Sequence, residues 1–134
     1  MLVSIGAVRS FLRVLLALEV LATLYGGVSA MATPVEFLPN ISSAVPGAAA
    51  PELTRLLGVA WIVIALILAS VPFLREVRAM RSILVAIMVG DVLHVTALMA
   101  SDDVHPGHFV LSAVFFAYRG AAVWRPRWLI RTEG

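Results

Sequence analysis

The chain has 134 residues, of which 61% are hydrophobic and 13% charged, a composition far more apolar than that of a soluble domain of this length. It contains no cysteine, which excludes disulfides, thiolate catalysis and thiolate metal sites. All ten basic residues are arginine, and the formal net charge is +2. Because the arginines flank apolar stretches, they indicate membrane topology and contact with anionic lipid headgroups rather than nucleic-acid binding.

Four apolar stretches are long enough to cross a bilayer as helices, which takes about 20 residues for a hydrocarbon core of about 30 Å. Together they leave no room for a second domain. The sequence therefore predicts one all-α membrane domain over residues 1–134, a bundle of four transmembrane helices. Its predicted partner is the lipid bilayer that surrounds it. The predicted spans are 13–32, 53–73, 82–100 and 108–128.

The distribution of arginine predicts the orientation of this bundle. The connections 33–55 and 101–108 contain only Arg55 and are otherwise neutral or acidic. Since arginine is retained on the cytoplasmic side, both termini are predicted to be cytoplasmic. The other nine arginines precede the first span, separate the second from the third, or lie in or after the fourth: Arg9, Arg13, Arg75, Arg78, Arg81, Arg119, Arg125, Arg127 and Arg131.

The first span has two interpretations. Two arginines, an apolar run and small residues at 28–32 are typical of a cleavable secretory signal. However, the run contains Glu19 and extends over the 20 residues 14–33, which favours a retained helix. Small residues at helical spacing let helices approach closely in lipid, so one face is predicted to point into the bundle. That face consists of Glu19, Ala22, Thr23, Gly26, Gly27 and Ala30.

The connection and the span that follow carry few chemical groups. Prolines at 34, 39, 46 and 51 predict a surface loop rather than a long helix. Asn40-Ile41-Ser42 is a formal N-glycosylation acceptor, although it is predicted to lie too near the bilayer to be used. The second span has no charge between Arg55 and Arg75 and is the most lipid-like of the four. Its predicted contacts with neighbouring helices are Gly58, Ala65 and Ala69.

The third span contains the most unusual pair of residues. Asp91 lies ten residues after Arg81, which is about 15 Å along a helix and therefore near the bilayer midplane. His94 follows three residues later on the same helix face. A carboxylate and an imidazole so placed can donate and abstract protons near neutral pH. The alternative is a hydrogen bond between helices, with Thr23 or Tyr25 as the partner.

A second ionisable pair follows from depth. Glu19 lies six residues inside Arg13, and Arg119 lies six residues inside Arg125, so both are about 9 Å from the inner boundary. An unpaired charge at such depth costs at least about 2.5–3.5 kcal/mol, so each needs a partner or water. Glu19–Arg119 is the predicted pair, and Asp91–Arg119 competes with it. Whether the pair only fixes helix register or also serves a site is open at this stage.

The connection between the third and fourth spans holds two carboxylates and two imidazoles, at Asp102, Asp103, His105 and His108. Such groups can ligate zinc or copper. A tight turn between helices favours Asp, Pro and Gly for backbone reasons alone, and this is the preferred interpretation. No cofactor and no metal are therefore predicted.

The order of several short motifs resembles the DoxX-like small four-helix integral membrane proteins. The motifs are Thr33-Pro34-Val35-Glu36-Phe37, then Glu52-Leu53-Thr54-Arg55 followed by Gly58, an arginine-rich inner turn, and Gly90-Asp91. The resemblance covers most of the chain. It implies the four-helix fold but no activity, because that group is functionally heterogeneous.

Two other families share single features with the chain. The small multidrug transporters have a membrane-embedded glutamate in their first helix, as Glu19 is predicted to be, but their apolar fourth helix has no counterpart of Arg119. The emopamil-binding sterol isomerases and membrane terpene cyclases protonate lipophilic substrates with acidic residues inside a bundle. Asp91, Glu19 and His94 are similar in kind to such a set.

The leading functional hypothesis is an acid/base enzyme of the isomerase or cyclase type that acts on a lipophilic small molecule within the bundle. Its predicted catalytic residues are Asp91 as acid or base and His94 as its partner, with Glu19 and Arg119 as a second charged pair. One alternative is a proton-coupled transporter, which would need to dimerise and would use Glu19 or Asp91 as the switching carboxylate. The other is a non-catalytic subunit of a membrane complex.

Overall fold

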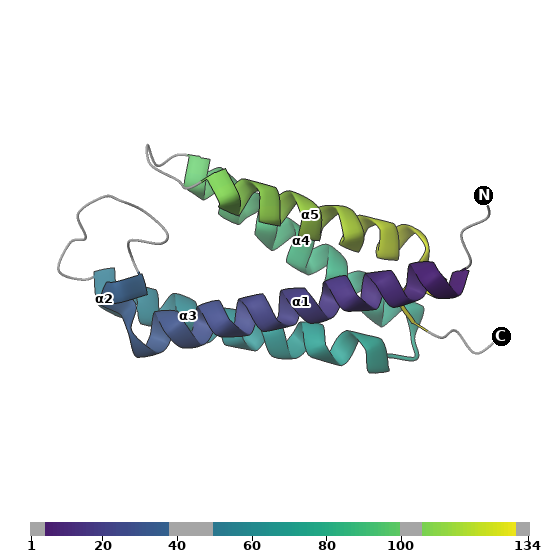
Figure 1. The fold of residues 1–134 in the computed structure, drawn as a ribbon, viewed down its shortest axis with the longest axis horizontal. Helices are drawn as coiled ribbons and strands as arrows, with labels where there is room; N and C mark the ends of the chain where they lie inside the picture. Colours follow the sequence, from purple (N-terminus) through teal and green to yellow (C-terminus); the bar gives the residue numbers. More distant parts are fainter. Residues whose placement is uncertain (1–4, 38–49, 100–105, 131–134) are drawn as a thin grey trace.

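The computed structural model describes residues 5–37, 50–99 and 106–130, which are entirely helical apart from short connections (Figure 1). Three of the described helices are long and apolar enough to cross a membrane, and the apolar part of α5, Phe109–Trp124, is shorter. The predicted all-helical class is therefore confirmed. The elements are α1 (Ile5–Ala32), α2 (Pro34–Phe37), α3 (Ala50–Ser70), η2 (Val71–Phe73), α4 (Val77–Met99), α5 (Pro106–Trp124) and η3 (Pro126–Trp128).

Proline lies in the first turn of five of these seven elements, all except α1 and α4. A proline in the first turn removes an N–H group that has no intrahelical partner in any case, so it is tolerated there. The backbone N–H of Thr33 still bonds to the carbonyl of Ser29 at 2.9 Å, after which Pro34 starts the single turn of α2. The predicted loop after the first span therefore begins with a helical turn. The prolines at 51, 72, 106 and 126 also lie in the first turns of their helices.

Two sequence interpretations fall on parts that are not described. Asn40, the formal glycosylation acceptor, lies outside the described residues. The same holds for Asp102, Asp103 and His105 and for the side chain of His108.

The helices α1 and α3 form one closely packed pair. A Cβ atom added to Gly27 would lie 2.8 Å from the carbonyl oxygen of Gly58, and one added to Gly58 would lie 2.6 Å from the carbonyl oxygen of Gly27. The two backbones therefore touch where neither has a side chain, the contact that small residues permit in membrane helices. The predicted inward face of α1 is confirmed at Glu19, Gly26, Gly27 and Ala30, which are buried.

The helices α4 and α5 form a second pair, and the two pairs are arranged as a wedge (Figure 1). They converge where α1 begins, α3 turns into α4 and α5 ends, and they diverge toward α2. The core is formed by apolar side chains from all four long helices and from the segment after α5. It contains Leu12, Leu16, Leu68, Val71, Met80, Leu84, Tyr118, Ala122, Leu129 and Ile130.

Arginine side chains fasten the segment after α5 to the narrow end of the wedge. Arg9 donates from Nη2 to the carbonyl oxygen of Arg127 at 2.9 Å, and Arg13 donates from Nε to that of Leu129 at 3.2 Å. Arg81 donates from Nε to the carbonyl oxygen of Val123 at 2.9 Å. The last carbonyls of a helix have no intrahelical donor, so these guanidinium groups satisfy acceptors that would otherwise be open.

The outer surface of the bundle is apolar. Large side chains such as Leu18, Leu21, Leu53 and Leu66 each expose more than half of their surface. An apolar surface this extensive is unusual for a soluble monomer and matches the hydrocarbon of a bilayer. The structure thus supports an integral membrane protein, while the cytoplasmic location of the termini stays a prediction.

Candidate functional site

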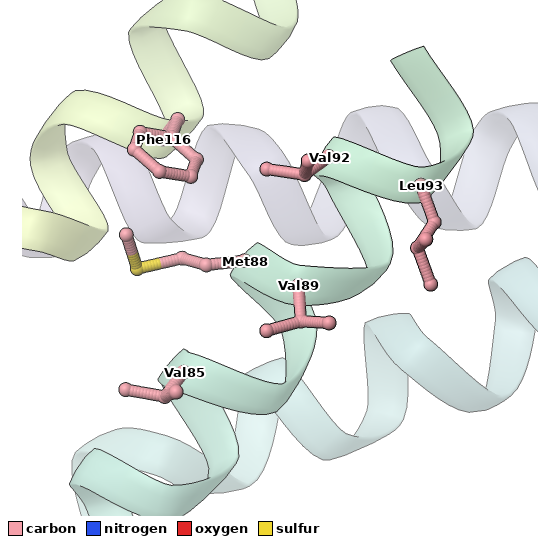
Figure 2. Close-up of a pocket in the computed structure, with 6 residues that line it drawn as sticks. All are labelled: Val85, Met88, Val89, Val92, Leu93 and Phe116. Carbon is pink, nitrogen blue, oxygen red and sulfur yellow. The ribbon is translucent and has the colours of Figure 1, made fainter. Parts of the chain in front are cut away.

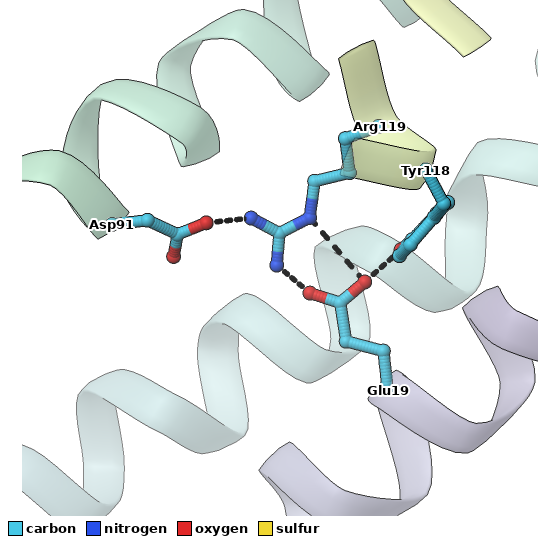
Figure 3. A network of polar contacts seen from close by, with 4 residues as sticks. All are labelled: Glu19, Asp91, Tyr118 and Arg119. Carbon is cyan, nitrogen blue, oxygen red and sulfur yellow. Dashed lines mark hydrogen bonds and ion pairs between the residues drawn. The ribbon is translucent and has the colours of Figure 1, made fainter. Parts of the chain in front are cut away.

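Three long helices bring their ionisable side chains together at one point (Figure 3). Arg119 of α5 forms ion pairs with Glu19 of α1 through Nη2 and with Asp91 of α4 through Nη1. Its Nε also donates to Glu19 Oε2 at 3.3 Å. The hydroxyl of Tyr118 donates to the same glutamate oxygen. The guanidinium is thereby held from two sides, with a carboxylate on each.

The side chains of this cluster differ in the fraction of their surface that is exposed. The side chain of Glu19 exposes 1% of its surface and that of Arg119 exposes 3%, whereas that of Asp91 exposes 28%. One carboxylate oxygen of Asp91 is bonded to Arg119, and the other points away from the guanidinium (Figure 3). Asp91 is therefore the most exposed of the three ion-paired side chains.

The cluster lies at a cavity of about 620 Å³ between the two helix pairs. A volume of this size is typical of sites that hold small molecules. Most of its wall is apolar. The lining residues are Glu19, Ala22, Thr23, Gly26, Phe37, Leu57, Ala60, Trp61, Ile64, Ala86, Ile87, Gly90, Asp91, His94, Leu111, Ser112, Phe115 and Arg119.

Aromatic rings from several elements line this cavity and contact one another edge to face. The centroid of the Phe37 ring in α2 lies 5.9 Å from the centroid of the Trp61 ring in α3. Trp61 in turn lies 6.4 Å from the imidazole of His94 in α4. The ring of Phe115 lies 5.9 Å from the guanidinium carbon of Arg119. The cavity thus combines charged groups with a wall of aromatic and aliphatic side chains.

The structure brings all four residues predicted as catalytic to this cavity. Both ion pairs that the sequence left as alternatives, Glu19–Arg119 and Asp91–Arg119, are present at once. Asp91 and His94 line the same cavity, as their spacing on one helix face indicated. Thr23, a candidate partner of Asp91, also lines it, but Tyr25 is 76% exposed and is excluded as that partner.

Two residues of the site were not singled out from the sequence. Nothing in the predicted fourth span distinguishes Tyr118, although a buried tyrosine hydroxyl usually needs a hydrogen-bond partner. The second residue is Trp61, which contacts both Phe37 and His94. Its three-dimensional neighbours come from α2 and α4, and no spacing within the second span points to them.

A second, smaller hollow of about 290 Å³ lies on α4 and α5 (Figure 2). Its lining is wholly apolar and carries no group that can transfer a proton, bind an ion or form a strong hydrogen bond. The lining residues are Val85, Met88, Val89, Val92, Leu93 and Phe116. Its chemistry is limited to contact with hydrocarbon.

No group of three or more metal-ligating side chains occurs among the residues that the structure describes. No protein family, curated protein or solved structure matches the chain. The resemblance to DoxX-like proteins therefore stays a prediction.

Proposed function

We propose that the cavity binds a lipophilic small molecule and that Asp91 and His94 move protons on it, in an isomerisation or a cyclisation. The observation that carries this proposal is that both side chains line one cavity whose remaining wall is largely aromatic and aliphatic. A general acid or base must lie within reach of the bound substrate, and this arrangement meets that condition.

The proposed roles follow from the contacts. Tyr118 donates to Glu19, Glu19 pairs with Arg119, and Arg119 holds one oxygen of Asp91, so the Asp91 carboxylate has a fixed orientation toward the cavity. For an isomerisation, Asp91 takes a proton from one carbon and the electron pair of that C–H bond becomes part of a shifted double bond. A proton returned to a second carbon by Asp91 or His94 leaves the substrate with its original composition.

We further propose that four helices cross the membrane with both termini in the cytoplasm. The arginines on the connections at the narrow end of the wedge support this orientation. The wide end of the wedge, where α2 lies, then faces the opposite side of the membrane. A lipophilic molecule would reach the cavity from the bilayer, between the diverging helix pairs.

Solvent deuterium tests the proposed chemistry without knowledge of the substrate. Purified protein in nanodiscs is incubated in D₂O with a lipid extract of its host membrane, and the lipids are analysed by mass spectrometry. Because exchangeable deuterons on Asp91 and His94 would be transferred to carbon, we expect a lipophilic product with non-exchangeable deuterium. Asp91→Asn should reduce its formation by at least about 100-fold, the lower end of what one positioned acid or base contributes.

The matched control is Glu52→Gln, which removes a carboxylate from the exposed first turn of α3, outside the cavity. It should leave deuteration unchanged. Equal deuteration by the wild type and by folded Asp91→Asn would refute the enzyme proposal.

A second candidate function rests on the sharing of one guanidinium by two carboxylates. Such a shared cation can change partners when one carboxylate is protonated, which suits a proton-coupled transporter. This function would be favoured if a lipophilic molecule is taken up into proteoliposomes in response to a pH gradient and this uptake is lost in Glu19→Gln. The deuterium experiment should then give no deuterated product.

A further inference from the structure

The charged groups around the cavity are unequal in number. Glu19 of α1 and Asp91 of α4 supply two carboxylates, and Arg119 of α5 supplies one guanidinium. The part of α3 that lines the cavity, Leu57, Ala60, Trp61 and Ile64, adds no charge. With both carboxylates ionised and His94 neutral, the formal charges of the described lining residues are −1, −1 and +1, which leaves one negative charge.

The surplus charge lies on the side from which a ligand approaches. Arg119 pairs with both carboxylates, but Glu19 and Arg119 are almost completely buried, whereas Asp91 exposes 28% of its side chain. A ligand that reaches the charged end of the cavity therefore meets a carboxylate oxygen before it meets the guanidinium. An uncompensated charge in a low-dielectric site is costly, so the cavity favours an occupant that neutralises it.

We infer that the cavity selects a lipophilic monovalent cation, such as an amine or ammonium compound with an apolar body. This inference rests on the proposed function, because it assumes that the cavity binds a lipophilic molecule, and it specifies the charge of that molecule. The aromatic rings support it, since a cation is attracted to the face of an indole or phenyl ring. Trp61 offers the largest of these rings in the cavity wall. An anionic ligand would instead meet the carboxylate of Asp91.

A pair of probe ions with the same shape and opposite charge tests the inference. Binding of tetraphenylphosphonium and tetraphenylborate is measured by equilibrium dialysis against protein in nanodiscs of zwitterionic lipid, with empty nanodiscs subtracted. For the wild type we expect at least about ten-fold tighter binding of the cation, a factor that corresponds to about 1.4 kcal/mol. This comparison requires no variant, so misfolding cannot obscure it.

Variants then locate the site. Asp91→Asn should weaken binding of the cation at least about ten-fold, because it removes the surplus charge. Trp61→Leu, which keeps every charge, should weaken the same binding by a smaller factor. Glu52→Gln lowers the negative charge of the chain by the same amount as Asp91→Asn, but outside the cavity, and should have no effect.

Equal affinity for the two ions, absence of saturable binding of either, or unchanged cation affinity in folded Asp91→Asn would each overturn the inference. These outcomes are distinct from failure of the proposed chemistry. If the cation binds through Asp91 but no deuterium reaches carbon, the ligand class stands and the acid/base reaction fails. If deuterium is incorporated while neither ion is preferred, the reaction stands and the ligand is not a cation.

Discussion

Arg119 is the residue on which the charged cluster depends, because it is the cation that both carboxylates share. Its guanidinium presents donors in a rigid planar fork, so it can bond to carboxylates on two sides at once, which the single ammonium of a lysine does less well. Removing different members of the cluster should therefore have unequal effects on stability.

Arg119→Gln should lower the free energy of unfolding by about 3–5 kcal/mol, since it leaves the buried Glu19 and the half-buried Asp91 without a cation. Glu19→Gln should cost less, about 1–3 kcal/mol, because Arg119 keeps its pairing with Asp91. Reversible unfolding in mixed detergent micelles, followed by circular dichroism, measures both values. Equal losses in the two variants would contradict the shared-cation arrangement.

The sequence predicted much of this cluster at the level of single residues. Glu19 lies six residues from Arg13, and Arg119 lies six residues from Arg125. Their equal depth in the membrane was enough to predict that they pair. Depth could not decide between Glu19 and Asp91 as the partner of Arg119, because a guanidinium on a long side chain reaches both. The role of Tyr118 depends on how α5 is rotated about its axis, because this rotation decides whether the side chain points toward Glu19. The sequence does not specify that rotation.

At the scale of the helices, the backbones of α1 and α3 are in contact at Gly27 and Gly58. The spacing of small residues predicted which face of each helix is packed. It did not predict that α1 and α3 form one pair while α4 and α5 form the other, because small residues indicate close contact without naming the partner helix.

Gly58→Ala should lower the free energy of unfolding by about 1–3 kcal/mol, the usual cost of overpacking. Its Cβ would lie 2.6 Å from the carbonyl oxygen of Gly27, and a backbone atom cannot move aside as the end of a side chain can. The measurement is again unfolding in mixed micelles.

Gly120→Ala in α5 is the matched control, since its Cβ would lie 3.8 Å from the methyl carbon of Met88, an ordinary contact. This variant should be neutral, or stabilised by up to about 1 kcal/mol through helix propensity. If the two variants are destabilised to a comparable extent, the close approach of α1 and α3 is not the reason that position 58 requires glycine.

At the scale of the whole molecule, the two helix pairs meet at one end and separate at the other, and this angle creates the cavity. Hydropathy identified the helices and their order along the chain. It could not predict the cavity, because the angle between the pairs depends on how side chains from different helices pack together, such as Leu16, Leu68 and Leu84 of the core. The contacts of Trp61 with Phe37 and His94 were hidden for the same reason.

The proposed orientation can be tested with single cysteines, because the chain has none of its own. Glu36→Cys in α2 and Glu76→Cys between α3 and α4 both change exposed positions, at opposite ends of the wedge. In intact cells, a membrane-impermeant maleimide should label position 36 at once and position 76 only after permeabilisation. The cysteine-free parent is the control. The reverse pattern of labelling would place the arginine-rich end outside.

The bonds from Arg9 and Arg13 to the carbonyls of Arg127 and Leu129 join the first and last helical segments of the bundle across more than a hundred residues of chain. During biosynthesis these acceptors emerge only after every transmembrane helix has been made. The narrow end of the wedge therefore cannot close while α5 is still in the ribosome. Until then, α1 and α3 can pack through their glycines only as a hairpin whose glutamate has yet to meet its arginine.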